Sequence, residues 1–413
     1  MSSTTTTTSP APRKRAAMSA QERRSSMTLA SIYGLRMLGL FLIMPVFAIY
    51  AHGLPGGDNR FLVGLALGGV YGLAQAILQI PFGMASDRFG RKPVMMLGLL
   101  IFAVGSFVAG VAHSIDGIIV GRAIQGAGAI SAAISAMIAD STRDHNRTKA
   151  MAMVGMTIGL SFIISLIAGP VLYHLIGVPG MFALTGILAL AAIAVIKWVV
   201  PDVPMSGRAE ELGAGASHES VLTPALLRLH FSIFVVNFTQ VAIFVVVPIA
   251  LVQHAGIPLR HHWMVYLPVT MGSFVLAVPG IILAESRGHM RAMLRGGVAL
   301  MGLSMLALSV GYRSEVPLIA ELFVFFVGFN LMEALLPSLV SRIAPASRKG
   351  LAMGVYNTAQ SLGLAAGGGI GGALARLWSY EAVFLACAAL CLVWLAVAWF
   401  VQAPPDRAEV PSS

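Results

Sequence analysis

The chain has 413 residues, of which 57% are hydrophobic and 11% are charged, and its mean hydropathy is +0.84. A soluble protein this apolar would precipitate, so the composition excludes a water-soluble protein and indicates a helical membrane protein. The net charge of +10 is explained by membrane orientation and by anionic lipid headgroups, so we expect a lipid bilayer and no nucleic acid as partner.

Apolar runs of bilayer-spanning length follow one another along the chain. Residues 1–27 are polar and basic without an apolar core, which predicts a disordered cytoplasmic tail and no signal peptide. The predicted spans are 28–50, 61–82, 93–113, 117–139, 150–176 and 180–200, then 226–251, 262–284, 292–312, 316–341, 350–375 and 380–402. The polar stretch 201–223 predicts a cytoplasmic linker, and 403–413 a cytoplasmic tail. The sequence therefore predicts an all-α integral membrane protein with twelve transmembrane helices in two six-helix bundles, 28–200 and 224–402.

The basic residues are distributed unevenly between the two sides of this arrangement. Twenty-one of the 27 Lys and Arg residues fall on one side, four fall on the other, and Arg36 and Arg122 lie inside spans. Because short cytoplasmic loops carry the excess of positive charge, both termini and the linker are predicted to be cytoplasmic.

The loop between the second and third spans is charged and flexible. It contains Gly83, Asp87, Arg88, Gly90, Arg91 and Lys92. Arg91 can pair with a carboxylate such as Asp140 at the end of the fourth span, and such pairs can latch one conformation. The alternative is a cluster of positive charge that only sets topology, but that needs neither Asp87 nor the glycines.

Three charged side chains inside predicted spans are candidates for function, because an unpaired charge there is costly. Glu333 is well inside the tenth span and is the clearest candidate proton carrier; the alternative is a protonated carboxyl bonded to a neighbouring helix. Arg36 is about nine residues into the first span and needs a partner, with a role in proton coupling left open. Arg122, about six residues into the fourth span, either snorkels to the interface or lowers the proton affinity of a nearby carboxylate.

Other polar and aromatic residues inside the spans are candidates for a substrate cavity. They are Tyr71, Gln75 and Gln79 in one stripe, together with Gln125, Asn237, Gln240, Phe329 and Asn330. Each could line the cavity or simply bond to or pack on a neighbouring helix. Gly363, Gly367 and Gly371 recur every four residues, which indicates close helix packing.

Enzyme motifs are missing from the sequence. There is no phosphate-binding Gly-Lys-Ser/Thr loop, no His-Glu-x-x-His and no nucleophile with its base, so we expect no enzyme and no use of ATP. Cys387 and Cys391 lie four apart but have no other ligand beside them, so we expect structural cysteines and no metal.

Several motifs together carry a family resemblance. Residues 83–92 resemble the signature loop of the major facilitator superfamily, Gly-x-x-x-Asp-Arg-x-Gly-Arg-Lys. Residues 121–129 resemble the fourth-helix motif of its proton antiporters, and Ala168-Gly169-Pro170 resembles part of their fifth-helix motif. Nearly the whole chain is similar to YajR-type drug:proton antiporters. About ten residues follow the last predicted span, so we expect that the soluble domain of that type is absent.

The resemblance implies a secondary transporter that exports small apolar or cationic compounds in exchange for protons, from a bacterial inner membrane. It implies that Arg122 takes part in proton coupling, that Gly169 and Pro170 shape helix packing, and that Asp87 meets the eleventh helix near Gly350. We expect a monomer with no cofactor beyond protons as coupling ion and a small-molecule substrate as partner. Two alternatives stay open: a proton-coupled importer of a sugar, nucleoside or organic acid, and a membrane sensor that binds a ligand without transporting it.

Overall fold

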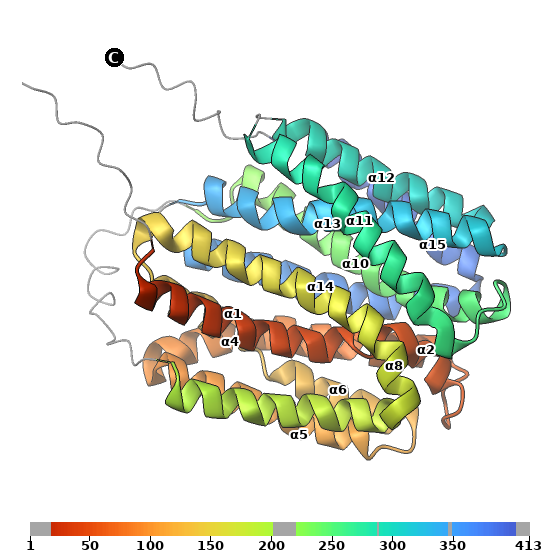
Figure 1. Ribbon diagram of the computed structural model, residues 1–413, viewed down its shortest axis with the longest axis horizontal. Helices are drawn as coiled ribbons and strands as arrows, with labels where there is room; N and C mark the ends of the chain where they lie inside the picture. Colours follow the sequence, from red (N-terminus) through yellow and green to blue (C-terminus); the bar gives the residue numbers. More distant parts are fainter. Residues whose placement is uncertain (1–17, 201–219, 287–288, 346–348, 402–413) are drawn as a thin grey trace, which may run out of the picture.

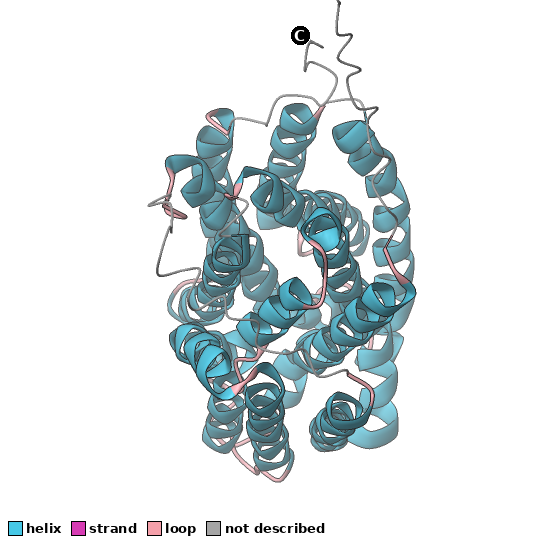
Figure 2. Ribbon diagram, turned by 90° about the vertical axis from the view of Figure 1, so that its left-hand side faces the viewer, coloured by secondary structure: helices cyan, strands magenta, loops and turns pink. Residues whose placement is uncertain are grey.

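The structure is a computed structural model that describes residues 18–200, 220–286, 289–345 and 349–401. These residues form helices joined by short loops, and among them there is no β-strand (Figure 2). The prediction of an all-α chain is therefore confirmed. Residues 1–17 and 402–413 of the expected tails, and 201–219 of the expected linker, lie outside the described residues.

The start of the first helix differs from the prediction. Helix α1 begins at Ala20, so residues 20–27 of the predicted disordered tail are helical. Ser19 and Glu22 form a capping box: the Glu22 backbone N–H donates to the Ser19 hydroxyl at 3.1 Å, and the Ser19 N–H donates to the Glu22 carboxylate at 2.8 Å. This pair satisfies two backbone donors at the helix start, which extends the helix beyond its apolar run.

The first half of the chain is built from long helices, several of them interrupted. It contains α1 (Ala20–Phe41), α2 (Met44–Ala51), α3 (Arg60–Gly64), the π-helical turn η1 (Leu65–Gly69), α4 (Val70–Phe89), α5 (Arg91–Gly110), α6 (Ile115–Ala127), α7 (Ser131–Asp140) and α8 (Asp144–Trp198). The first, second and fourth predicted spans thus each consist of more than one helical segment.

The second half is more regular. It contains α10 (Pro224–Gln253), the 3₁₀ turn η2 (Leu259–His261), α11 (His262–Ser286), α12 (Met290–Gly311), α13 (Glu315–Ile343), α14 (Lys349–Leu377) and α15 (Tyr380–Trp399). Side chains at the N-termini of two helices accept from their first turns: Thr223 from Leu226 N at 3.3 Å and Ser379 from Ala382 N at 3.1 Å.

In the described part of the chain, ten helical segments are long and apolar enough to cross a membrane. One of them, Met153–Trp198, is broken at Gly177, whose φ of 65° is not helical, so it holds the predicted spans 150–176 and 180–200. Helix α14, with 29 residues, is also long enough to span. The structure is therefore consistent with twelve spans.

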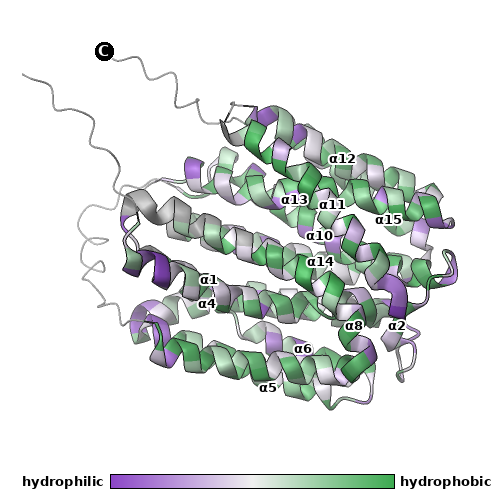
Figure 3. Cartoon of the chain, viewed as in Figure 1, coloured by the Kyte–Doolittle hydropathy of each residue, from purple (hydrophilic) through white to green (hydrophobic). Residues whose placement is uncertain are grey.

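The helices run side by side along the long axis, with hydrophilic residues gathered toward their ends (Figures 1 and 3). Arg228 and Arg295, near the starts of α10 and α12, donate to the Phe400 and Trp399 carbonyls at 2.7 and 3.1 Å, so these starts share one end with the end of α15. We call this the proximal end, and the opposite end, with residues 52–59 and 378–379, the distal end.

The two halves meet tightly toward the distal end, in a contact that we call the distal gate. It consists of Gly64, Gly68, Gly69 and Gly72 of the second span and Ser361, Leu364, Gly368 and Gly372 of α14. A Cβ on Gly64 would overlap the Gly368 carbonyl, and a Cβ on Gly368 would lie 2.6 Å from the Gly69 nitrogen. Only glycine permits this backbone approach. At the rim, Arg60 lies over the Tyr380 ring at 5.7 Å.

Candidate functional site

A small cavity lies between the two halves. It is lined by Tyr33 of α1, Ser135 of α7, Val154, Gly155 and Ile158 of α8, Glu333 and Pro337 of α13, and Met353, Tyr356, Asn357 and Gln360 of α14. Its volume of about 30 Å³ suits one or two water molecules, whereas ligand pockets measure roughly 300–1,000 Å³. The cavity therefore has room for water and for nothing larger in this conformation.

Glu333 is the acidic group of this cavity. Its side chain is half-buried, and the phenol rings of Tyr33 and Tyr356 lie close enough to interact with it. Among the described residues it makes no hydrogen bond or ion pair, and no basic side chain lines the cavity. A carboxyl group in such a place is stable when it carries a proton or when a cation lies beside it.

Among the described residues, Arg36 has neutral polar partners and no carboxylate partner. Its side chain is 2% exposed; Nη1 donates to Ser131 Oγ at 3.0 Å and Nη2 donates to Gln75 Oε1 at 3.1 Å. The guanidinium also lies 5.8 Å from the centroid of the Tyr71 ring. The predicted need for a partner is thus met by neutral side chains, and Gln75 bonds to Arg36 instead of lining the cavity.

Arg122 is fully buried, so the alternative of snorkelling to the interface is wrong. Its Nε donates to the Ala66 carbonyl at 3.0 Å and its Nη2 to the Leu67 carbonyl at 2.7 Å. Both carbonyls belong to the π-helical turn η1. Arg122 is only about six residues from the end of its predicted span, which suggested that its side chain could reach the interface. In the structure the neighbouring second span covers this face of α6.

A third donor group of Arg122 ties it to its own helix. Nη1 donates to Gln125 Oε1 at 2.9 Å, and Gln125 Nε2 donates to Ser106 Oγ on α5 at 2.7 Å. The guanidinium also stacks over the Tyr71 ring at 4.7 Å. Tyr71 and Gln125 therefore hold Arg122, and neither lines the cavity.

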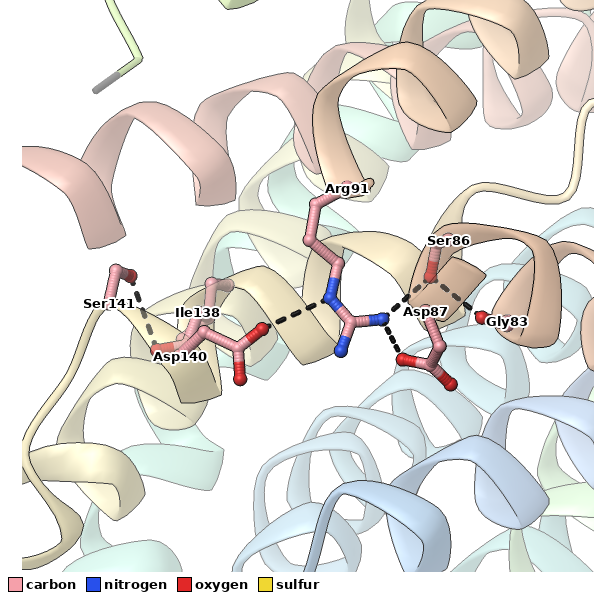
Figure 4. Close-up of polar contacts among 7 residues, drawn as sticks. All are labelled: Gly83, Ser86, Asp87, Arg91, Ile138, Asp140 and Ser141. Carbon is pink, nitrogen blue, oxygen red and sulfur yellow. Dashed lines mark hydrogen bonds and ion pairs between the residues drawn. The ribbon is translucent and has the colours of Figure 1, made fainter. Parts of the chain in front are cut away.

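The charged loop forms an ion-pair cluster at the proximal end (Figure 4). Arg91 Nε donates to Asp140 Oδ2 at 3.0 Å, and Nη1 donates to Ser86 Oγ at 2.7 Å and pairs with Asp87. The cluster joins the end of α4 and the start of α5 to the end of α7. The pairing of Arg91 with Asp140 is the contact expected from the sequence.

The other residues of this loop have different places. Gly90 has φ of 96° and ψ of 149°, which a side chain would strain, and it separates α4 from α5. Arg88 is exposed and lies over the Phe89 ring at 5.4 Å, while Lys92 is half-buried at the start of α5. A Cβ on Gly83 would lie 3.5 Å from Ala132 of α7. Residues 346–348, just before Gly350, lie outside the described residues, and the expected contact of Asp87 near Gly350 stays a prediction.

The remaining cavity candidates lie outside the cavity lining; Asn330 is half-buried, and the others are buried. Asn237 donates to the Ile233 carbonyl at 3.1 Å, and Asn330 donates to Ser273 Oγ at 3.1 Å. Phe329 packs against Phe162 of the first half, with ring centroids 5.2 Å apart. Gln79 and Gln240 are each 1% exposed, and their amide groups have no hydrogen-bond partner among the described residues.

The glycines chosen as packing positions lie where two backbones approach. Gly363, Gly367 and Gly371 of α14 face Phe234, Phe238 and Ala242 of α10, and a Cβ on Gly363 or Gly367 would overlap the facing carbonyl. A Cβ on Gly169 would lie 2.7 Å from the Leu42 carbonyl, at the turn between α1 and α2. Pro170 lies inside α8 directly after it.

Sequence reasoning missed most of the residues that line the cavity. Tyr356, Asn357 and Gln360 bring three polar groups into five residues of an otherwise apolar span, and this signal was available beside the glycine pattern. Tyr33 carries no such signal, because a single tyrosine in an apolar span is also found at lipid-facing positions.

Comparison with known proteins identifies the family. The profile of the Major Facilitator Superfamily matches residues 29–368 and 229–413. The chain belongs to the Major Facilitator Superfamily. It is 42% identical to the inner membrane transport protein YajR of Escherichia coli over 402 residues. This alignment covers 96% of this chain and 88% of that protein.

More distant similarities are consistent with this family. The chain is 26% identical to multidrug resistance protein 1 of Bacillus subtilis over 88% of this chain and 92% of that protein. The crystal structure of the human organic anion transporter MFSD10 (TETRAN) has the same fold, with a TM-score of 0.70 at 18% identity over 92% of this chain and all of that one. The protein is thus a multi-pass membrane transporter, and not an enzyme.

Proposed function

We propose that this transporter exports small apolar or cationic compounds across the bacterial inner membrane in exchange for protons, by alternating access of a central cavity. The observation that carries the proposal is Glu333, a carboxyl group in the cavity between the two halves without a basic partner there. A proton and a cationic substrate can each neutralise this group. Because they compete for one carboxyl, binding one favours release of the other.

The direction of transport is supported by the antiporter-like motifs. Arg122 with its flanking glycines and Gly169-Pro170 resemble motifs of proton antiporters, and multidrug resistance protein 1 is among the similar proteins. The cavity lining carries one acidic and no basic side chain, which suits a cationic substrate better than an anionic one. The expected partners are a small molecule and lipid, the coupling ion is the proton, and the chain is expected to act as a monomer.

Orientation follows from the basic residues. The proximal end carries most of the Lys and Arg residues, so we place it, the linker and both termini in the cytoplasm. The distal gate then faces outward. Two six-helix bundles, 28–200 and 224–402, would rock about the cavity, as transporters built from repeats do.

The test is proton movement by the full-length protein in liposomes with an imposed pH gradient. Lipophilic cations, amphenicols and sugars are added in turn, and proton release is followed with a pH-sensitive dye. Glu333→Gln keeps the size of the side chain but cannot bind and release a proton, so substrate-driven proton release should fall to background. Glu321→Gln is the matched control, because Glu321 is on the same helix but lies against Gly311 of α12, away from the cavity.

Three results would contradict the proposal. Sugar and protons moving in the same direction would establish an importer, and saturable binding without flux would establish a sensor. Unchanged antiport in Glu333→Gln would remove the proposed carrier.

A further inference from the structure

The second span is not a regular helix where it forms the distal gate. Residues Leu65–Gly69 form a π-helical turn, in which the Val70 N–H donates to the Leu65 carbonyl five residues earlier. A π turn accommodates one more residue than an α-helical turn, displaces its carbonyls from their normal donors, and is often found at functional sites. Carbonyls displaced in this way inside a membrane need other donors.

Arg122 supplies these donors. Two arms of its guanidinium donate to the neighbouring carbonyls of Ala66 and Leu67, and the third donates to Gln125 on its own helix. Arginine suits this place because its donors are fixed in a planar fork and its charge cannot be lost. The guanidinium is fully buried, so water does not compete for the two carbonyls.

The opposite side of the same turn meets the other half of the protein. A Cβ on Gly68 would lie 2.8 Å from Val241 of α10 and 3.1 Å from the Leu364 carbonyl of α14. The Gly69 nitrogen lies 2.6 Å from the place of a Cβ on Gly368. The π turn is thus held between Arg122 on one side and the second half on the other.

We propose that Arg122 is a positioning residue for the distal gate: it holds the turn Leu65–Gly69 in the π geometry against which α14 closes. Loss of its fork removes the charged donors from the Ala66 and Leu67 carbonyls, and the turn then relaxes toward an arrangement that no longer fits Gly368. The proposal rests on alternating access but not on proton coupling, so it stands or falls separately from the role of Glu333.

The experiment measures the gate directly and needs no substrate or gradient. Asp58 and Trp378 are exposed on distal loops of the two halves, and spin labels on Asp58→Cys and Trp378→Cys report their separation by double electron–electron resonance. Cys387 and Cys391 stay in place, because they are 0% and 1% exposed and do not take up label. The full-length protein is studied in lipid nanodiscs at mildly acidic and mildly alkaline pH.

In Arg122→Lys and Arg122→Met, the ratio of short to long distances between the two labels should shift by about tenfold or more toward long distances. The shift should occur at both pH values, because each variant loses charged hydrogen bonds to buried carbonyls. Arg36→Lys is the control: Arg36 is also buried over Tyr71 but donates to Ser131 and Gln75, so the distances should stay as in the wild type. If only the charge of Arg122 mattered, Arg122→Lys would keep the wild-type distances. That result, or a shift seen at only one pH, would overturn the proposal.

A second variant covers the case in which Arg122→Met does not fold. Deleting Leu65 removes the extra residue of the turn and should return it to a regular helix; the deletion variant itself is the reference for the distances, because it also moves Gly64. In that background Arg122→Lys should change the distance ratio by less than about twofold, because the two changes act on one contact. An equal shift with and without the deletion would show that Arg122 does not act through the π turn.

Discussion

At the scale of single residues, Gly90 tests the geometry of the charged loop. Its φ of 96° and ψ of 149° belong to a region that other residues avoid, so Gly90→Ala should lower the free energy of unfolding by about 1–3 kcal/mol. Gly296→Ala is the control, because Gly296 is in helix α12 and a Cβ there meets nothing within 4 Å. Thermal unfolding in detergent measures both, and equal melting temperatures for the two variants would contradict the strain at Gly90.

Charged residues inside spans were predictable as important, but their partners were not. Glu333 and Arg36 stand out in any hydropathy plot, because a charge in lipid demands an explanation. That Arg36 bonds to Ser131 and Gln75, while Arg122 bonds to backbone carbonyls of another span, depends on how the helices rotate and pack. Periodicity gives the face of a helix but not its neighbour, so the sequence left open whether Gln75 and Gln125 line the cavity or bond to a helix, and in the structure both hold arginines.

At the scale of elements, the close contact of α14 with the second span depends on Gly368 and not on Gly369. A Cβ on Gly368 would overlap the Gly64 carbonyl, whereas one on Gly369 would only touch Leu65 at 3.9 Å. Gly368→Ala should therefore open the distal gate, and Gly369→Ala should leave it closed. The measurement is the labelling rate of Leu364→Cys, whose position is 3% exposed, by a hydrophilic thiol reagent in a chain with Cys387→Ala and Cys391→Ala.

The labelling rate should rise about tenfold or more with Gly368→Ala, because an overlap with backbone cannot be relieved by a side-chain movement. A rise of the same size with Gly369→Ala would show that α14 loosens as a whole. The spacing of small residues in this helix predicted close helix packing but not which helices it contacts. Gly363, Gly367 and Gly371 do face α10, while Gly368 and Gly372, one position along, face the other half.

At the scale of the whole molecule, the all-α membrane class followed from composition and apolar runs, because lipid leaves helices as the only spanning element here, and the structure is consistent with the twelve predicted spans. The start of α1, the π turn and the break at Gly177 did not follow, since each depends on local capping or on tertiary contacts. The cavity depends on the approach of both halves and therefore on the conformation. A contracted cavity behind a closed distal gate implies that transport requires this gate to open.

That requirement predicts the effect of tying the distal ends together. A short, cleavable linker between Asp58→Cys and Trp378→Cys joins the two halves and should reduce flux in proportion to the linked fraction, with recovery when the linker is cut. Linking Asp58→Cys to Asp116→Cys is the control, because both positions lie at the distal end of the first half, where the Ile115 N–H donates to the Pro55 carbonyl at 3.2 Å. This second link should leave flux unchanged. Flux that persists in fully linked protein would mean that substrate leaves without separation of the halves. In that case opening of the contact between α14 and the second span would not be required for transport.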